Sequence, residues 1–148
     1  MKSGKRTSLK AKSLLERFVF LLSRLGSADC RQASLKAIAA VSLFDKPIKR
    51  DVAGPLDLVP VFQACLRQKS VGVRCSACHC LRSLSRDAAV IRTNITDSGA
   101  GIAVYNLFKK EDEDIRVTAA ALATVCNLVN EFSPLRTVSL RDSNTRRC

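Results

Sequence analysis

The stretch that decides the fold is residues 73–85, which read Val-Arg-Cys-Ser-Ala-Cys-His-Cys-Leu-Arg-Ser-Leu-Ser. Around Ala77, apolar residues recur at Val73, Leu81 and Leu84, which are the positions −4, +4 and +7. Side chains at these intervals lie on one face of an α-helix, because the helix turns once in about 3.6 residues. The spacing therefore predicts a helix that is buried along one face.

The same pattern occurs again on both sides of this stretch. One copy has apolar residues at the same four positions, which are Val117, Ala121, Val125 and Leu128. A second, weaker copy has Ala33, Ala37, Val41 and Phe44. The anchor alanines Ala37, Ala77 and Ala121 are 40 and 44 residues apart. A period of about 40 to 47 residues is typical of armadillo and HEAT solenoids. We expect a shorter apolar helix before each long one, at 14–25, 56–67 and 102–110.

Breaks between the apolar segments bound the expected helices. Gly26 follows the first short helix as its C′ glycine, and Asp29 is expected to cap the long helix that comes next. Asp114 opens the last long helix. That helix should end near Phe132, because Pro134 disfavours helical backbone at the residue before it.

We therefore expect an all-α fold, a right-handed armadillo-repeat superhelix (α-solenoid) of about three repeats. The repeats are expected to occupy residues 14–134. Residues 1–13 are expected to form a basic flexible N-terminal tail, and residues 135–148 a C-terminal tail or a truncated next repeat. The terminal repeats would leave their outer faces exposed, so self-association through these ends is expected.

The charge balance favours anionic partners. The chain has 25 Lys and Arg against 13 Asp and Glu, a formal net charge of +12. Much of this surplus lies near the two ends, where we expect solvated tails, and no basic stripe alternates with aromatic residues as in many nucleic-acid-binding surfaces. The composition disfavours specific nucleic-acid binding. A basic, nucleic-acid-associated helical repeat protein stays open as the alternative function.

The seven cysteines show no spacing typical of a disulfide framework. A secretory signal is not recognisable, and no apolar stretch reaches the length of about 20 residues that a membrane span needs. Reduced thiols are typical of the cytoplasm and the nucleus, where we expect the protein. The basic, acid-free residues 1–15 leave a mitochondrial transit peptide open as an alternative.

One cysteine cluster has the letters of a known motif. Cys75 to His79 reads C-x-x-C-H, the attachment motif of c-type haem, yet His79 is the only histidine and Met1 the only methionine. The four side chains that could bind zinc on this helix point around its circumference and cannot meet at one metal ion. They are Cys75, Cys78, His79 and Cys80. A zinc site completed by another cysteine stays an alternative, the candidates being Cys30, Cys65 and Cys126. We expect no cofactor, no metal and no catalytic residues, and hence no enzyme.

Several strings between residues 70 and 136 resemble one particular family. They are Cys80-Leu81-Arg82-Ser83-Leu84-Ser85-Arg86, Ile91-Arg92-Thr93 and Cys126-Asn127-Leu128-Val129-Asn130-Glu131-Phe132-Ser133-Pro134. They are similar to the armadillo-repeat-containing protein eight family, which includes a yeast vacuolar-import-and-degradation counterpart. The resemblance implies a non-catalytic scaffold subunit of the GID/CTLH E3 ubiquitin ligase, which holds the substrate receptor against the catalytic core. Its implied partners are ligase subunits and the substrate receptor. Family members are much longer, so this chain would be a fragment, a truncated gene model or a diverged short paralogue.

The expected binding groove follows from the repeat positions. Peptide-binding armadillo repeats that resemble importin-α carry Trp at anchor +2 and Asn at anchor +6 of the third helix. In this chain only Asn127 fits, which disfavours a receptor for nuclear-localisation signals. The candidate protein-binding groove is neutral or basic and suits an extended polar or acidic segment; solvation alone is the other interpretation of these residues. Its members are His79, Ser83, Arg86, Asn127 and Asn130.

Overall fold

The computed structural model describes residues 3–24, 26–44, 58–86, 95 and 98–129. In these ranges the regular secondary structure is helical, and no strand occurs. No helix there is long and apolar enough to cross a membrane. The helices are α1 (Ser3–Arg24), α2 (Ala28–Phe44), α4 (Val59–Leu66), α5 (Val71–Leu84), α7 (Ala100–Lys109) and α8 (Ile115–Leu128).

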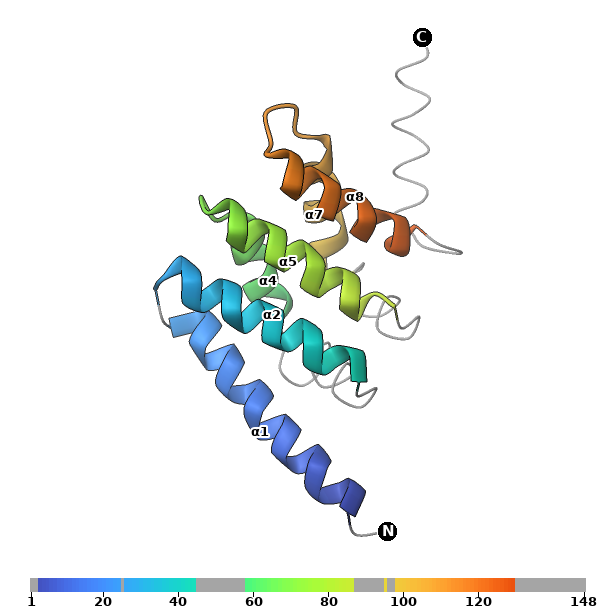
Figure 1. The fold of residues 1–148 in the computed structure, drawn as a ribbon. Coiled ribbons are helices and arrows are strands. Elements are labelled where there is room, and N and C mark those ends of the chain that lie inside the picture. The colour runs from blue at the N-terminus through green and yellow to red at the C-terminus, as the bar shows by residue number, and fades with distance from the viewer. Residues whose placement is uncertain (1–2, 25, 45–57, 87–94, 96–97, 130–148) are drawn as a thin grey trace.

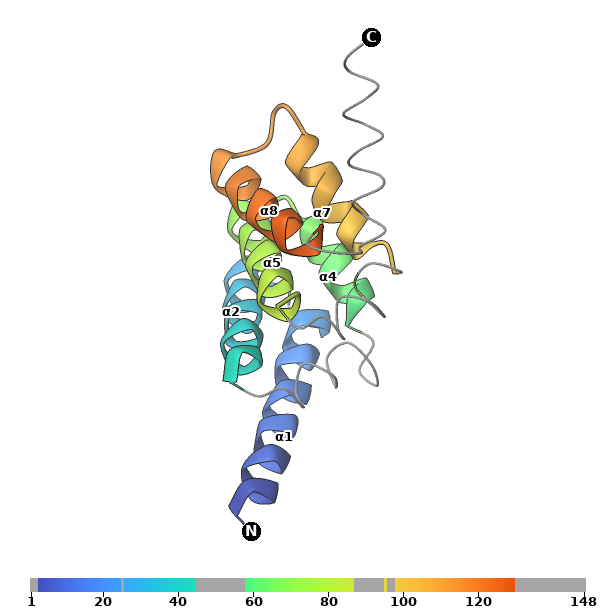
Figure 2. The same cartoon turned by 90° about the vertical axis from the view of Figure 1, so that its right-hand side faces the viewer.

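The helices are arranged in two layers. The long helices α2, α5 and α8 lie side by side in one layer, and α4 and α7 form the other (Figures 1 and 2). Within the first layer α2 packs on α5, and α5 packs on α8. Between the layers α4 packs on α5 and α7 on α8, while α1 packs on α2. The stacking of α2, α5 and α8 in one layer, each packed on a helix that precedes it in the chain, confirms the expected all-α armadillo solenoid.

The two strong copies of the repeat pattern form the core as predicted. Val73, Ala77, Leu81 and Leu84 on α5 are all buried. The second copy is buried as well, with Val117, Ala121, Val125 and Leu128 on α8 facing inward. Alanine at the centre of each stripe has a steric role, because a short side chain lets neighbouring helix axes approach closely.

The start of each long helix is marked by a capping side chain. Ser70 Oγ accepts a hydrogen bond from the Val73 amide, and the Asp114 carboxylate accepts one from the Arg116 amide. Ser27 Oγ accepts from the Cys30 amide at 3.2 Å, so Ser27 caps α2 in place of the expected Asp29, which lies in the first turn. The three caps are 43 and 44 residues apart, and they give the repeat period directly.

The capping side chains show that the weak copy was placed in the wrong register. Counted from the caps, Ser34 on α2 corresponds to Ala77 on α5, where the sequence pattern had assigned Ala37. Ala33 is exposed and Ala37 is half-buried. A shift of three residues moves a position by only about 60° around a helix, so the wrong stripe still looked apolar. The buried residues of α2 are instead Ser34, Leu35, Ile38 and Ser42.

The helix bounds also differ from expectation near the N-terminus. Helix α1 begins at Ser3 and not at Leu14, so the helix extends into the segment 1–13 that was expected to form a basic flexible tail. This stretch has no proline and contains several lysines, with leucine and alanine, which are good helix formers. The division into repeats and tails stays a prediction, since residues 135–148 lie outside the described ranges.

The other bounds follow known end signals. Helix α4 has Pro60 in its first turn, as expected. Gly99 precedes α7 with φ at 81°, a left-handed conformation that glycine adopts without strain. Helix α8 ends at Leu128, earlier than predicted, and Phe132 and Pro134 lie outside the described residues.

We expect Ala77→Leu to lower the free energy of unfolding by about 1–3 kcal/mol, because Ala77 is fully buried and a larger side chain would separate α5 from its neighbours. Ala64→Leu on the exposed side of α4 is the matched control and should change stability by less than about 0.5 kcal/mol. Urea unfolding followed by circular dichroism checks both. Equal effects of the two substitutions would contradict the role given to Ala77.

Candidate protein-binding site

The layer of long helices carries the residues that the sequence placed in a groove. His79 is exposed in the middle of α5, and Arg86 is exposed just beyond its end. Both side chains are available to a partner protein. Asn130 lies outside the described residues, so its place in the groove stays a prediction.

Two of the other predicted groove residues bond to the neighbouring repeat. Ser83 is buried, and its Oγ donates a hydrogen bond to the Ala39 carbonyl on α2 at 3.0 Å. Asn127 is half-buried, and its Nδ2 lies 3.4 Å from the Arg82 carbonyl on α5, to which it donates. These side chains join adjacent long helices, and their contact with a partner stays a prediction.

A third side chain of the same kind was not predicted from the sequence. Thr124 on α8 is fully buried, and its Oγ1 lies 2.9 Å from the Cys78 carbonyl on α5 and 2.8 Å from the carbonyl of Ala120 in its own helix. A buried hydroxyl needs such an acceptor, since an unsatisfied one costs free energy. The signal in the sequence was a polar residue on the inner side of an otherwise apolar helix.

The corrected register adds one residue to the candidate site. Lys36 lies nine positions after the Ser27 cap, and His79 lies nine positions after the Ser70 cap. Lys36 is exposed on α2, so it holds on that helix the place that His79 holds on α5. The wrong register had assigned Ala39 to this place, which explains why Lys36 was missed. The row formed by Lys36, His79 and Arg86 is a neutral-to-basic edge of the long-helix layer.

Arg74, near the start of α5, forms an ion pair with Glu113 in the loop that precedes α8, and it also bonds to the loop that precedes α5. Arg74 donates through Nη1 to the carbonyls of Gln68 and Lys69, and through Nη2 to Glu113 Oε1. Burial by itself would raise the pKa of Glu113, but the hydrogen bonds from Arg74 and the Asp114 amide, with the charges of Arg74 and Lys110, hold that pKa below its usual value. Glu113 is therefore ionised at neutral pH and fixes the relative position of the two loops.

The thiols of the C-x-x-C-H stretch lie in the packed interior. Burial raises the pKa of the Cys78 thiol to about 12, and it raises the pKa of Cys80 further. Cys75 is half-buried, and burial raises its pKa as well. These thiols stay protonated at neutral pH, and the thiolate is the form that attacks or binds metal. In the described ranges no three His, Cys, Asp or Glu residues gather where they could hold a metal ion.

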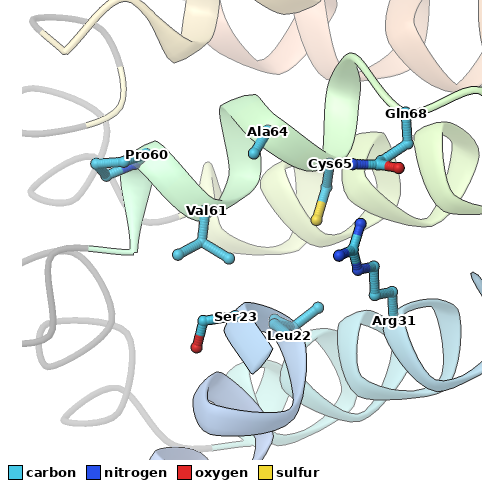
Figure 3. Close-up of a pocket in the computed structure, with 8 residues that line it drawn as sticks. All are labelled: Leu22, Ser23, Arg31, Pro60, Val61, Ala64, Cys65 and Gln68. Atoms are coloured by element: carbon cyan, nitrogen blue, oxygen red, sulfur yellow. The ribbon is translucent and has the colours of Figure 1, made fainter. Parts of the chain in front are cut away.

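A pocket of about 290 Å³ opens between the end of α1, the start of α2 and helix α4 (Figure 3). Arg31 extends into it from α2 toward Cys65 on α4 and Gln68 just after that helix. Arg31 Nε is buried and has no hydrogen-bond partner in the described part of the chain. One cation among apolar walls suits a small side chain that ends in a carboxylate. The lining consists of Leu22, Ser23, Arg31, Pro60, Val61, Ala64, Cys65 and Gln68.

Comparison with known proteins agrees with this architecture. The chain is 35% identical over 105 residues to "GID complex subunit 5" of Schizosaccharomyces pombe, which is 71% of this chain. It is 32% and 30% identical over 106 residues, 72% of the chain, to "Armadillo repeat-containing protein 8" of Xenopus laevis and Danio rerio. Over this shared part, the chain is a homologue of armadillo repeat-containing protein 8 and of GID complex subunit 5.

The similarity covers one segment of much longer relatives. The aligned residues span 13%, 14% and 16% of the fission-yeast, frog and zebrafish proteins. No family model matches the chain, and no solved structure matches it. The resemblance read from the strings between residues 70 and 136 is therefore confirmed as a partial match to armadillo repeat-containing protein 8.

We expect Ser83→Ala to lower the free energy of unfolding by about 1 kcal/mol, because it removes a hydrogen bond between α5 and α2. Ser85→Ala is the matched control, since among the described residues Ser85 Oγ bonds to the Arg82 carbonyl, three residues away in the same segment, and its effect should be smaller. Chemical denaturation of the two variants measures the difference. A larger loss in Ser85→Ala would contradict a structural role for Ser83.

Glu113→Gln should lower the melting temperature at pH 7 by about 4 °C or more, because it leaves Arg74 without its charged partner. The folded-state pKa of Glu113 is depressed, so its contribution is present above its ordinary value of 4.5 and is lost as the pH falls through the folded value. The melting temperatures of wild type and variant should therefore converge in acid. Glu111→Gln, at an exposed position, should melt like wild type throughout; a pH-independent difference for Glu113→Gln would contradict this account.

Proposed function

We propose that this chain is a non-catalytic armadillo-repeat scaffold that binds partner proteins as a subunit, or part of a subunit, of a GID/CTLH-type E3 ubiquitin ligase. The observation that carries the proposal is the 35% identity to a protein named as a GID complex subunit. Within such an assembly the chain would help hold the substrate receptor against the catalytic core, in the cytoplasm and the nucleus.

The structure supports a binding role through the layer of long helices. Stacked helices present an extended face whose positions repeat with every helix, and such faces bind elongated partner segments. On this face Lys36, His79 and Arg86 are exposed, and the shape of the face is fixed by the hydrogen bonds between adjacent long helices. A rigid face needs little ordering when a partner binds, which favours affinity.

The chemistry of the row suggests the kind of partner segment. Lys36 on α2, with His79 on α5 and Arg86 just beyond the end of α5, would attract an extended segment that carries carboxylates. Leu43 on α2 is exposed, with 48% of its surface accessible, and supplies an apolar contact on the same helix as Lys36. We propose an acidic segment with interspersed apolar side chains as the ligand of this row.

The buried thiols support a scaffold role and not a catalytic one. A cysteine nucleophile needs a lowered pKa and an accessible sulfur. The described thiols of α5 have raised pKa values and lie wholly or partly buried. Any ubiquitin transfer would then depend on another subunit.

Affinity purification of the full chain from its own cells, followed by mass spectrometry, tests the proposal. The wild type should recover ligase subunits. The charge reversal Lys36→Glu with Arg86→Glu should reduce their recovery at least tenfold, because it removes both cations of the row. Arg67→Glu with Lys69→Glu is the matched control, since these exposed residues lie just after α4, and it should recover the same subunits as wild type.

Absence of every ligase subunit from the wild-type sample would contradict the proposal. Recovery of nucleic acid in their place, with binding that weakens steeply between about 50 and 200 mM salt, would favour the nucleic-acid-associated alternative. If both charge-reversal variants recover the ligase subunits equally well, the chain still joins the ligase, but the Lys36–His79–Arg86 row is not its contact surface.

A further inference from the structure

Helix α8 carries an apolar stripe that is open to solvent. The stripe is formed by Ile115, Ala119, Leu122 and Cys126, and all four residues are exposed. Ile115 has 77% of its surface accessible and Leu122 has 44%. Their spacing of 4, 3 and 4 residues places them on one side of the helix. We call this set the α8 stripe.

The preceding helix shows what normally covers such a stripe. Counted from the caps at Ser70 and Asp114, the residues of α5 that correspond to the α8 stripe are Val71, Cys75, Cys78 and Arg82. Helix α8 packs over them: Thr124 lies against the Cys78 carbonyl, Asn127 donates to the Arg82 carbonyl, and the Cys75 thiol lies 3.8 Å from the Arg116 carbonyl. None of these four residues of α5 is exposed. The α8 stripe is therefore the face onto which a further long helix would stack.

Helix α2 carries the complementary stripe at the other end of the stack. Cys30, Ala33 and Ala40 are exposed and Ala37 is half-buried, and they share one side of the helix. We call this set the α2 stripe. The corresponding residues of α5 are buried in the stack, where Ser83 bonds to α2; they are Val73, Ser76, Cys80 and Ser83. The α2 stripe is therefore the face that a preceding long helix would cover.

The two stripes fit one another in size and polarity. The α2 stripe has small side chains, as have the corresponding positions Ser76 and Cys80 on α5. The α8 stripe adds the larger Ile115 and Leu122, which can fill the space that alanines leave. Neither stripe contains a charged residue. Both belong to a packing mode that the molecule already uses twice, between α2 and α5 and between α5 and α8.

We propose that this chain associates head to tail with a second copy of itself, the α8 stripe of one copy packing on the α2 stripe of the next. The contact would repeat the geometry by which α5 packs on α2. Because the two contacting surfaces differ, each added copy leaves one stripe of each kind open, and the assembly can grow without closing. This inference goes beyond the proposed ligase role and does not depend on it.

Salt gives the association a characteristic signature. Each copy has a formal net charge of +12, so copies repel one another at low ionic strength, while the contact itself is apolar. Added salt should therefore strengthen the association. Binding to nucleic acid would respond in the opposite direction.

Sedimentation velocity of the full chain over a concentration series, at low and at high salt, tests the proposal. The wild type should show a mass that rises with concentration to at least twice the 16.1 kDa of the monomer, and more so at high salt. Leu122→Glu blocks the α8 stripe and Ala40→Glu blocks the α2 stripe, so each variant alone should stay monomeric. An equimolar mixture should form a dimer and stop there, because each variant contributes its one intact stripe.

The matched control is Ile102→Glu, which places the same charge on an exposed apolar position of α7, in the other layer. It should associate like wild type, and all three variants should melt within a few degrees of wild type by circular dichroism. A wild type that stays monomeric at every concentration and salt would overturn the proposal. So would an Ala40→Glu variant that still associates, because the contact would then join two identical surfaces. If the affinity purification recovers no ligase subunits, the proposed function fails, but the outcomes expected in sedimentation velocity stay the same.

Discussion

The structure depends on the close side-by-side packing of α2, α5 and α8. This packing needs small side chains where the helices meet, and alanine, serine and cysteine supply them at Ala77, Ser76, Cys80 and Ala121, which are buried. Short side chains bring the helix backbones near one another, so that Ser83 and Asn127 reach carbonyl oxygens of the neighbouring helix. These hydrogen bonds then fix how far each helix is shifted along its neighbour, which apolar contact by itself defines less well.

The repeat of that packing also determines the surfaces. Once the helices share a register counted from Ser27, Ser70 and Asp114, corresponding residues form rows across the layer. One row is exposed and carries Lys36 and His79. The rows on the flanks of each helix are buried inside the stack and become open at its two ends. A binding face and two stacking faces thus follow from one geometrical rule.

The sequence predicted the fold well where the apolar pattern was strong. The buried stripes of α5 and α8 and the cap at Asp114 were read correctly, because local spacing determines them. The register of α2 was predicted wrongly, because positions three residues apart on this helix look equally apolar. The cap at Ser27 was the signal that could have corrected it. The Arg74–Glu113 pair and the pocket at Arg31 join segments that are distant in sequence, and the local spacing of residues does not indicate such contacts. The hydrogen bond from Thr124 to the Cys78 carbonyl on α5 likewise joins residues 46 positions apart.

The central claim is the common register of the three long helices, and nuclear Overhauser effects measure it most directly. In a sample with labelled alanine methyl groups and serine side chains, Ser83 should show a cross-peak to Ala39, because its hydroxyl bonds the Ala39 carbonyl. The register anchored on Ala37 would bring Ser83 beside Ser42, three residues further along α2. A cross-peak from Ser83 to Ser42, with none to Ala39, would contradict the account of the stack and of the surfaces derived from it.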